Sequence, residues 1–185
     1  VHELPFENIL FETEKVANES KRSIQEAARE LRYTWLEELR KKHKAAVIVT
    51  AHHLNDNIET LIFNLAKGTG IKGIRGMLPK NRHVVRPFLE TSVNQIWDYI
   101  QSKNIQFRED SSNALLKYDR NKIRHELIPV LEEINSNLLV NFREHFKRWQ
   151  DIEAYHELIL TEWRKKLFTK EGASIFIPIA KLKQL

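Results

Sequence analysis

The chain has 185 residues and a formal net charge of +5, enough sequence for one hydrophobic core with an appended helical piece. It contains no cysteine, which excludes disulfides, thiolate nucleophiles, cysteine zinc sites and iron–sulfur clusters within these residues. No apolar run approaches the roughly 18 residues of a membrane-spanning helix and no secretory segment opens the chain, so we expect a soluble, cytoplasmic protein whose positive charge favours polyanionic partners.

The first predicted elements are a helix, a strand and a second helix. Residues 23–43 have apolar positions at helical spacing, with charged residues between them. Residues 45–49 form a short, largely β-branched run that predicts a buried strand, and residues 54–66 again have helical periodicity. This order indicates an α/β sheet.

Imidazoles and carboxylates gather where the predicted strand at 45–49 ends. His52, His53, Asp56 and Glu59 follow one another at spacings that place them on one helix face, at the edge where open α/β sheets bind ligands. An equally weighted alternative is that Asn55 or Asp56 only caps the helix and Glu59 is solvated. A zinc site is a weaker alternative because the H-E-x-x-H pattern is absent.

A basic segment without any acid lies between Glu59 and Glu90. Four glycines and six cations suit a phosphate backbone there, although a solvated basic surface is the ordinary alternative. The G-x-G-x-x-G match at 68–73 follows a helix instead of a strand, and no helix-forming run follows before Pro79, so we reject a dinucleotide-binding loop. The cations are Lys67, Lys72, Arg75, Lys80, Arg82 and Arg86.

Shorter elements are predicted in the middle of the chain. Residues 84–88 read as a second strand closed by Pro87, and Thr91 or Ser92 caps a helix that ends near residue 103. Residues 105–107 alternate like a brief strand, and the polar segment 109–113 follows. The order is β–α alternation that passes into helices.

A second cluster of polar residues lies on a predicted helix after residue 119. Arg120, Asn121, Arg124 and His125 form i,i+4 pairs on one side, and two arginines that face one way suit a phosphate. Taken alone, a surface helix with Arg–Glu pairs is the favoured alternative. The predicted buried stripe of this helix consists of Ile123, Leu127, Val130, Leu131 and Ile134.

The C-terminal third predicts core or docking surface. Residues 137–169 have the apolar spacing of a long helix or helix pair, Gly172 ends it, and residues 174–179 read as a strand or linker.

Five motifs follow one another along the chain: A-H-H-L-N-D-N-I-E-T at 51–60, K-G-T-G at 67–70, R-P-F-L at 86–89, E-D-S-S-N at 109–113 and R-N-K-I-R-H at 120–125. Taken together and in this order, they resemble the tRNA(Ile)-lysidine synthetases, a family of the PP-loop (N-type) ATP pyrophosphatase superfamily. The resemblance covers roughly residues 5–135, and the predicted helix at 23–33 also looks like that family. No single motif would suffice.

The resemblance implies an α/β fold: a partial doubly wound parallel sheet, adenine nucleotide alpha hydrolase-like, followed by a helical subdomain. We expect residues 1–113 to form the partial catalytic domain, 114–170 the helical subdomain, and 171–185 a linker or the start of another domain. The superfamily's S-G-G-x-D-S loop should follow the first strand, yet no glycine precedes Gly68. We therefore expect the first strands to be missing and residues 1–185 alone to be inactive.

The activity that the resemblance implies has two steps. ATP adenylates the C2 oxygen of the wobble cytidine in a tRNA(Ile) with a CAU anticodon, and the ε-amine of free L-lysine then displaces AMP to give lysidine. The implied cofactors are ATP and Mg2+, and the loop for the phosphates is not in this chain.

The matching positions carry the implied roles. Asp56, Glu59 and His53 would bind lysine, and Asp56, Arg120, Arg124 and His52 would be catalytic; no metal ligands are implied. The residues implied to bind tRNA or phosphate are Lys67, Lys72, Arg75, Arg86, Arg120, Asn121, Arg124 and His125.

Three alternatives remain open. Another PP-loop nucleotide- or tRNA-modifying enzyme would share the strand and helix core, although the lack of cysteine counts against thiolation. A metallohydrolase would use the His52, His53, Asp56 and Glu59 group to hold zinc. A noncatalytic tRNA-binding fragment would bind many tRNAs with steep salt dependence. Oligomeric state is undetermined, and a homodimer is one arrangement left open.

Overall fold

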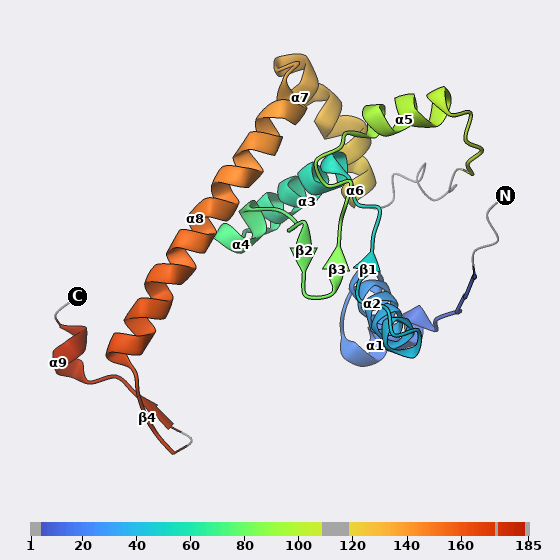
Figure 1. Ribbon diagram of the computed structural model, residues 1–185. Helices are drawn as coiled ribbons and strands as arrows, with labels where there is room; N and C mark the ends of the chain where they lie inside the picture. Colours follow the sequence, from blue (N-terminus) through green and yellow to red (C-terminus); the bar gives the residue numbers. More distant parts are fainter. Residues whose placement is uncertain (1–4, 109–118, 173, 184–185) are drawn as a thin grey trace. The chain divides into compact units, whose positions relative to one another are not determined.

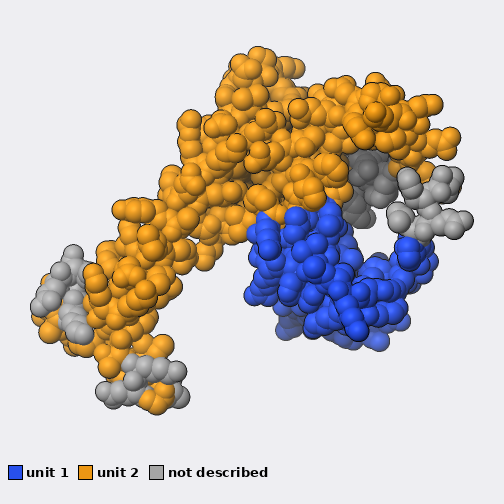
Figure 2. Space-filling model, in the orientation of Figure 1, with its two compact units in different colours: residues 1–50, 80–85 blue, residues 51–79, 86–185 orange. Residues whose placement is uncertain are grey.

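The computed structural model describes residues 5–108, 119–172 and 174–183 (Figure 1). The chain forms two compact units: one consists of residues 1–50 and 80–85, the other of residues 51–79 and 86–185 (Figure 2). Within the described ranges, no helix combines the length and apolar character needed to cross a bilayer.

The first unit contains two helices, α1 (Thr13–Ser20) and α2 (Ile24–Lys42). α2 begins where predicted because the Ser23 hydroxyl accepts a hydrogen bond from the backbone N–H of Glu26, while the Glu26 carboxylate accepts one from the backbone N–H of Ser23. Ala17 of α1 and Ala27 of α2 are both buried, and the two helices pack together. The predicted helix at 23–43 is confirmed.

A small three-stranded sheet completes the first unit. Strand β1 (Ile48–Val49) pairs in parallel with β3 (Val84–Val85), and β2 (Lys80–Asn81) pairs antiparallel with β3. The predicted strands at 45–49 and 84–88 are confirmed as shorter elements, since the chain turns at Arg86, whose carbonyl accepts the backbone N–H of Leu89 at 3.3 Å. β2 was not predicted because its two residues are polar; a turn with Arg82 at φ 52° brings it back against β3.

The second unit is mainly helical (Figure 1). Its central helix is α3 (Leu54–Lys67), whose residues Leu54, Ile58 and Leu61 are fully buried in the core. The remaining elements are α4 (Ile71–Ile74), α5 (Val93–Ser102), α6 (Asp119–Lys122), the π-helix η2 (Ile123–Leu127), α7 (Ile128–Ile134), α8 (Leu138–Leu167), β4 (Thr169–Glu171), β5 (Ser174–Phe176) and α9 (Ile179–Leu182). α8 is one continuous helix, and β4 pairs antiparallel with β5.

The predicted apolar stripe after residue 119 is confirmed at Ile123 and Leu131, which lie in or against the core, and is wrong at its other positions. Ile123 and Ile128 are buried in the core, whereas Leu127 is 41% exposed and Ile134 is 77% exposed. The cause is η2, because a π turn places residue i+5, instead of i+4, above residue i. A prediction that assumes a uniform α-helix therefore selects Leu127 where the structure buries Ile128.

Two further expectations differ from the structure, and others lie outside the described residues. Residues 105–107 form no strand; instead the ring of Phe107 packs edge-on against Trp97, with 4.7 Å between centroids. The glycine segment contains one short helical turn, α4, which sequence periodicity missed, but it follows helix α3 and so is still no dinucleotide-binding loop. The E-D-S-S-N motif and the predicted domain boundary at residue 113 lie outside the described residues.

The loop after α4 is fixed to α3 and α8 through Gly76. This glycine has φ 68°, and an added Cβ would overlap Oδ1 of Asn57 and the ring of Phe146. The Asn57 side chain is buried, and its Oδ1 accepts the backbone N–H of Met77 at 2.6 Å. A side chain at position 76 would therefore separate three packed elements.

We expect Gly76→Ala to lower the free energy of unfolding by roughly 2–3 kcal/mol, because it adds both backbone strain and a steric overlap. Urea denaturation checks this value. Gly70→Ala is the matched control, since Gly70 has φ −91° and open space around its Cβ position. Equal stability of the two variants would contradict the role assigned to Gly76.

Candidate functional site

The first turn of α3 is closed by a reciprocal cap between His53 and Asp56. Imidazole Nδ1 of His53 accepts the backbone N–H of Asp56 at 3.3 Å, and Oδ2 of Asp56 accepts the backbone N–H of His53 at 3.0 Å. The capping residue is thus His53, so the expectation that Asn55 or Asp56 caps the helix is wrong, and Asp56 is instead the third helical residue that completes the capping box. The expectation that Glu59 is solvated is also wrong, because Glu59 is buried. Asn55 instead accepts the backbone N–H of Val93 through Oδ1 at 3.0 Å, which joins α3 to the start of α5.

Two carboxylates of α3 hold the guanidinium of Arg124, which η2 supplies. Arg124 donates from Nε to Oε1 of Glu59 at 2.6 Å and from Nη2 to Oε2 of Glu59 at 3.0 Å. Its Nη2 also lies 3.2 Å from Oδ1 of Asp56. Such a planar, two-pronged contact has specific geometry and is stronger than a single neutral hydrogen bond.

The Glu59 carboxylate is almost completely withdrawn from water. Its side chain is 3% exposed, and that of Arg124 is 34% exposed. Burial raises the pKa of Glu59 above its usual 4.5, while the hydrogen bonds and charge of Arg124 act in the opposite direction. Burial alone would lower the pKa of Arg124, but the hydrogen bonds and charge of Glu59 and the charge of Asp56 raise it overall. Each group therefore controls the ionisation of the other.

The other residues of the two predicted clusters lie on the segments that carry this contact or lead into them. Nη2 of Arg120 lies 3.3 Å from Oγ1 of Thr60, one residue after Glu59 on α3. His52 is half-buried in the loop before α3, Asn121 is half-buried in α6, and His125 is exposed on η2. The structure thus brings Asp56, Glu59, Arg120 and Arg124 together along α3.

Thr60 is the residue that sequence reasoning overlooked. Its hydroxyl donates to the backbone carbonyl of Asp56 at 2.8 Å and accepts from Arg120. Its position four residues after Asp56 was the available signal, because a threonine on a helix commonly bonds to the carbonyl one turn earlier.

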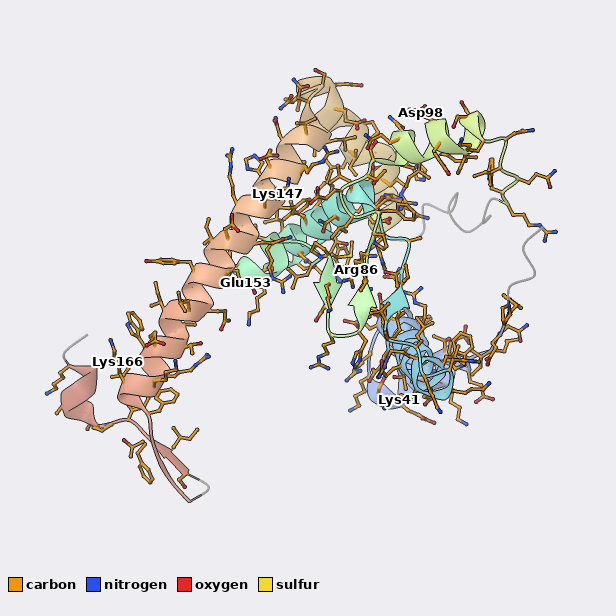
Figure 3. All side chains as sticks on the ribbon, in the orientation of Figure 1. Lys41, Arg86, Asp98, Lys147, Glu153 and Lys166 are labelled. Atoms are coloured by element: carbon orange, nitrogen blue, oxygen red, sulfur yellow. The ribbon has the colours of Figure 1, made fainter. Side chains whose placement is uncertain are left out.

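The cations of the basic segment are used in different ways. Arg86, labelled in Figure 3, is buried and donates from Nη1 to the carbonyl of Leu78 at 2.8 Å. Arg75 pairs with Glu153 of α8, and Lys72 pairs with Glu157 at 3.0 Å. Lys67 remains exposed, with Nζ 4.2 Å from the centroid of the Phe63 ring. Arg75 and Arg86 therefore stabilise the second unit in this conformation, and their predicted phosphate contacts stay predictions.

The described residues provide neither a metal cluster nor a cradle for nucleotide phosphates. No three His, Asp or Glu side chains in this part of the chain are grouped to hold a metal ion. The sequence holds neither S-G-G-x-D-S nor G-x-x-x-x-G-K-[ST]. These residues thus do not fit a bound ATP·Mg2+ complex by themselves.

Comparisons with known proteins agree on one family. A model of the PP-loop domain matches residues 5–131. The tRNA(Ile)-lysidine synthase of Bacteroides thetaiotaomicron is 39% identical over 165 residues, or 89% of this chain and 39% of that protein. That of Thermosipho africanus is 46% identical over 125 residues, or 68% of this chain and 29% of that protein. The chain spans about two fifths of the length of the first of these relatives.

We expect Arg124→Gln to raise the pKa of Glu59 further, because it removes the cation that opposes burial. Carboxyl 13C NMR titration measures this pKa, and Lys122→Gln, which removes a cation from the same helical segment but does not contact Glu59, is the control. An unchanged or lowered pKa in Arg124→Gln would contradict the contacts described.

Glu59 should also shape the pH dependence of stability. Its folded pKa lies above the unfolded value, so its contribution to the free energy of unfolding is fully present below the unfolded pKa and is lost as the pH rises through the folded pKa. Subtracting the urea-unfolding profile of Glu59→Gln from that of the unsubstituted chain should give a difference that declines with pH across this window. A flat or rising difference would contradict it.

Proposed function

This chain belongs to the PP-loop domain family, and from this membership we propose that it supplies the lysine- and tRNA-binding part of an ATP-dependent ligase that forms lysidine. In the proposed reaction the C2 oxygen of the wobble cytidine of tRNA(Ile) with a CAU anticodon is first adenylated. The ε-amine of free lysine then forms a bond to C2, and the C2 oxygen leaves with AMP. The proposed setting is the cytoplasm.

The acid–arginine cluster is the observation that carries the proposal. Asp56, Glu59 and Arg124 lie inside the region matched by the PP-loop model, and their charges sum to one negative unit when all three are ionised. A single ammonium group would balance that charge, because carboxylates form their strongest hydrogen bonds with cationic donors. We therefore assign lysine binding to Asp56 and Glu59, with His53 holding Asp56 in place.

Arg124 has two roles open to it in the proposed reaction. Its present contacts support a positioning role, in which it orients both carboxylates and opposes the rise that burial causes in the pKa of Glu59. The alternative role, a clamp on the phosphate that leaves with AMP, requires the guanidinium to release at least one carboxylate. The positioning role is the one we favour. For Arg120 and His52 we propose the catalytic role, beside the reacting groups, that the family resemblance implies.

Proposed contacts with the tRNA backbone come from exposed polar and basic side chains near the cluster. Lys67 and His125 are exposed, and Arg120 is exposed one helical turn from Arg124. Such groups position a nucleic acid through its phosphates without reading its sequence. Asn121, Lys72, Arg75 and Arg86 are proposed as further contacts, the last three only where their present partners release them.

ATP and Mg2+ take part in the proposed reaction, but we assign neither of them to a binding residue in this chain. Because the residues described do not fit these groups, no step is derived through them. The same observation favours a second candidate, in which these 185 residues act as a noncatalytic tRNA-binding piece.

Lysine incorporation tests the proposed function. The chain, extended at its N-terminus to include an S-G-G-x-D-S loop, should attach labelled lysine to a tRNA(Ile) transcript with a CAU anticodon when ATP and magnesium are present, and should leave a methionine tRNA unlabelled. Asp56→Asn should reduce incorporation at least 100-fold, since loss of one charge-assisted contact costs about 3 kcal/mol. Glu132→Gln, at an exposed position of α7, is the matched control. Full activity in Asp56→Asn would remove the lysine pocket from the proposal.

The 185-residue chain by itself should release no pyrophosphate from ATP in the presence of the same tRNA, because it contains no phosphate loop. A pyrophosphate assay with the purified chain measures this, and the extended protein is the positive control. Release by the shorter chain would show that the described residues bind ATP in a way their sequence does not reveal.

A further inference from the structure

An apolar groove lies beside the acid–arginine cluster in the second unit. It has a volume of about 440 Å3 and opens between the last turns of α3 and the α6–η2 segment. Phe63 and Ala66 line it from α3, and Ile123 and Leu127 line it from η2. This volume falls within the range of small-ligand sites, which is about 300–1,000 Å3.

Two cations lie over the ring of Phe63, the aromatic residue among the described lining of this groove. Nζ of Lys67 lies 4.2 Å from the centroid of the Phe63 ring, and Cζ of Arg120 lies 6.0 Å from it. Lys122 lines the groove on the opposite side, where its Nζ is 4.0 Å from Glu126. Three cations and one acid around an apolar floor give the groove a positive rim.

A flat apolar face with a positive rim matches the chemistry of an unpaired nucleotide. A nucleobase stacks on an aromatic side chain in a sequence-tolerant way, and neighbouring Lys or Arg residues hold the phosphates on either side. An apolar peptide would use the floor but would gain nothing from Lys67, Arg120 and Lys122. Charge complementarity therefore selects the nucleotide.

The groove continues the same two elements that form the acid–arginine cluster. Phe63 follows Glu59 by four residues on α3, which corresponds to about 6 Å along the helix axis. Lys122 precedes Arg124 by two residues where α6 passes into η2. A strand of RNA with one base at the cluster would have a neighbouring base within reach of the groove.

We propose that the groove formed by Phe63, Ala66, Ile123 and Leu127 binds an unpaired base of the RNA substrate next to the base that is modified, with its phosphates on Lys67 and Lys122. The inference rests on the proposed function for the identity of the RNA, and adds a base-stacking site that the phosphate contacts do not include. The bound nucleotide is recognised by its ring face, so purines and pyrimidines both enter.

The test is binding of a labelled single-stranded RNA pentamer to the 185-residue chain, compared with the same pentamer carrying an abasic central position. Fluorescence anisotropy should show at least fivefold tighter binding of the intact pentamer. Phe63→Leu, which keeps an apolar side chain but removes the ring, should abolish that difference. Lys122→Gln should weaken both pentamers and reduce the salt dependence of binding, whereas Lys103→Gln on the surface near α5 should change neither.

A measurement on the unsubstituted chain covers the case in which Phe63→Leu does not fold. Methyl NMR signals of Ala66, Ile123 and Leu127 should shift on addition of AMP or CMP and stay in place with ribose 5-phosphate. Equal binding of intact and abasic pentamers, or methyl signals that ignore the nucleotides, overturns the proposal.

The outcomes separate this inference from the proposed function. If the protein incorporates no lysine but its RNA binding depends on the base and on Phe63, the base-stacking site is supported and the ligase reaction is contradicted. If Phe63→Leu incorporates lysine with an unchanged KM for tRNA, the ligase reaction is supported and the base-stacking site is contradicted.

Discussion

The contact of Arg124 with Glu59 and Asp56 determines how the helical unit is put together around its polar centre. Glu59 faces the interior of a unit that is otherwise held by aliphatic and aromatic side chains, and a carboxylate there is costly without a partner. The partner comes from 65 residues further along the chain. Because the guanidinium bonds both oxygens of Glu59, it sets the rotation of the η2 segment against α3 as well as its distance. The groove at Phe63 and the contact between Arg120 and Thr60 both depend on that rotation.

Local signals in the sequence predicted the longer helices α2, α3, α5 and α8, but not the shorter α1, α4 and α9. Ser23 and Ser92 each begin a helix with a capping box, and such boxes are recognisable from residue types three apart. The short strands were also found, since Ile48 and Val84 lie in β-branched runs. Strand β2 and the π turn could not be found this way. Strand β2 forms because it pairs with β3. The π turn forms because Ile128, and not Leu127, is buried after Ile123, and only tertiary packing decides between them.

The candidate site was predicted in part, for a similar reason. Spacing placed Asp56 and Glu59 on one side of a helix, and both are there. Spacing within a segment says nothing about which distant group will face it, so Arg124 was assigned to a phosphate when its nearest anions are protein carboxylates. The same holds for the basic segment: its composition suggested an open positive surface, yet Arg86 is buried and Arg75 is paired with Glu153. Net charge counted along a sequence overstates the charge available to a partner.

The π turn at Ile123–Leu127 makes this stretch sensitive to length in a way that substitution would not reveal. Each residue of a helix advances the side chains by about 100° around the axis, so removing one residue from the turn would restore an ordinary α-helix and rotate everything on one side of it relative to the other. Arg124 and Ile128 could then no longer meet Glu59 and the core together. A substitution at the exposed position 127 leaves both of these contacts in place, whereas deletion of one residue would break at least one of them. The number of residues in this turn therefore matters more than the identity of the exposed side chain at position 127.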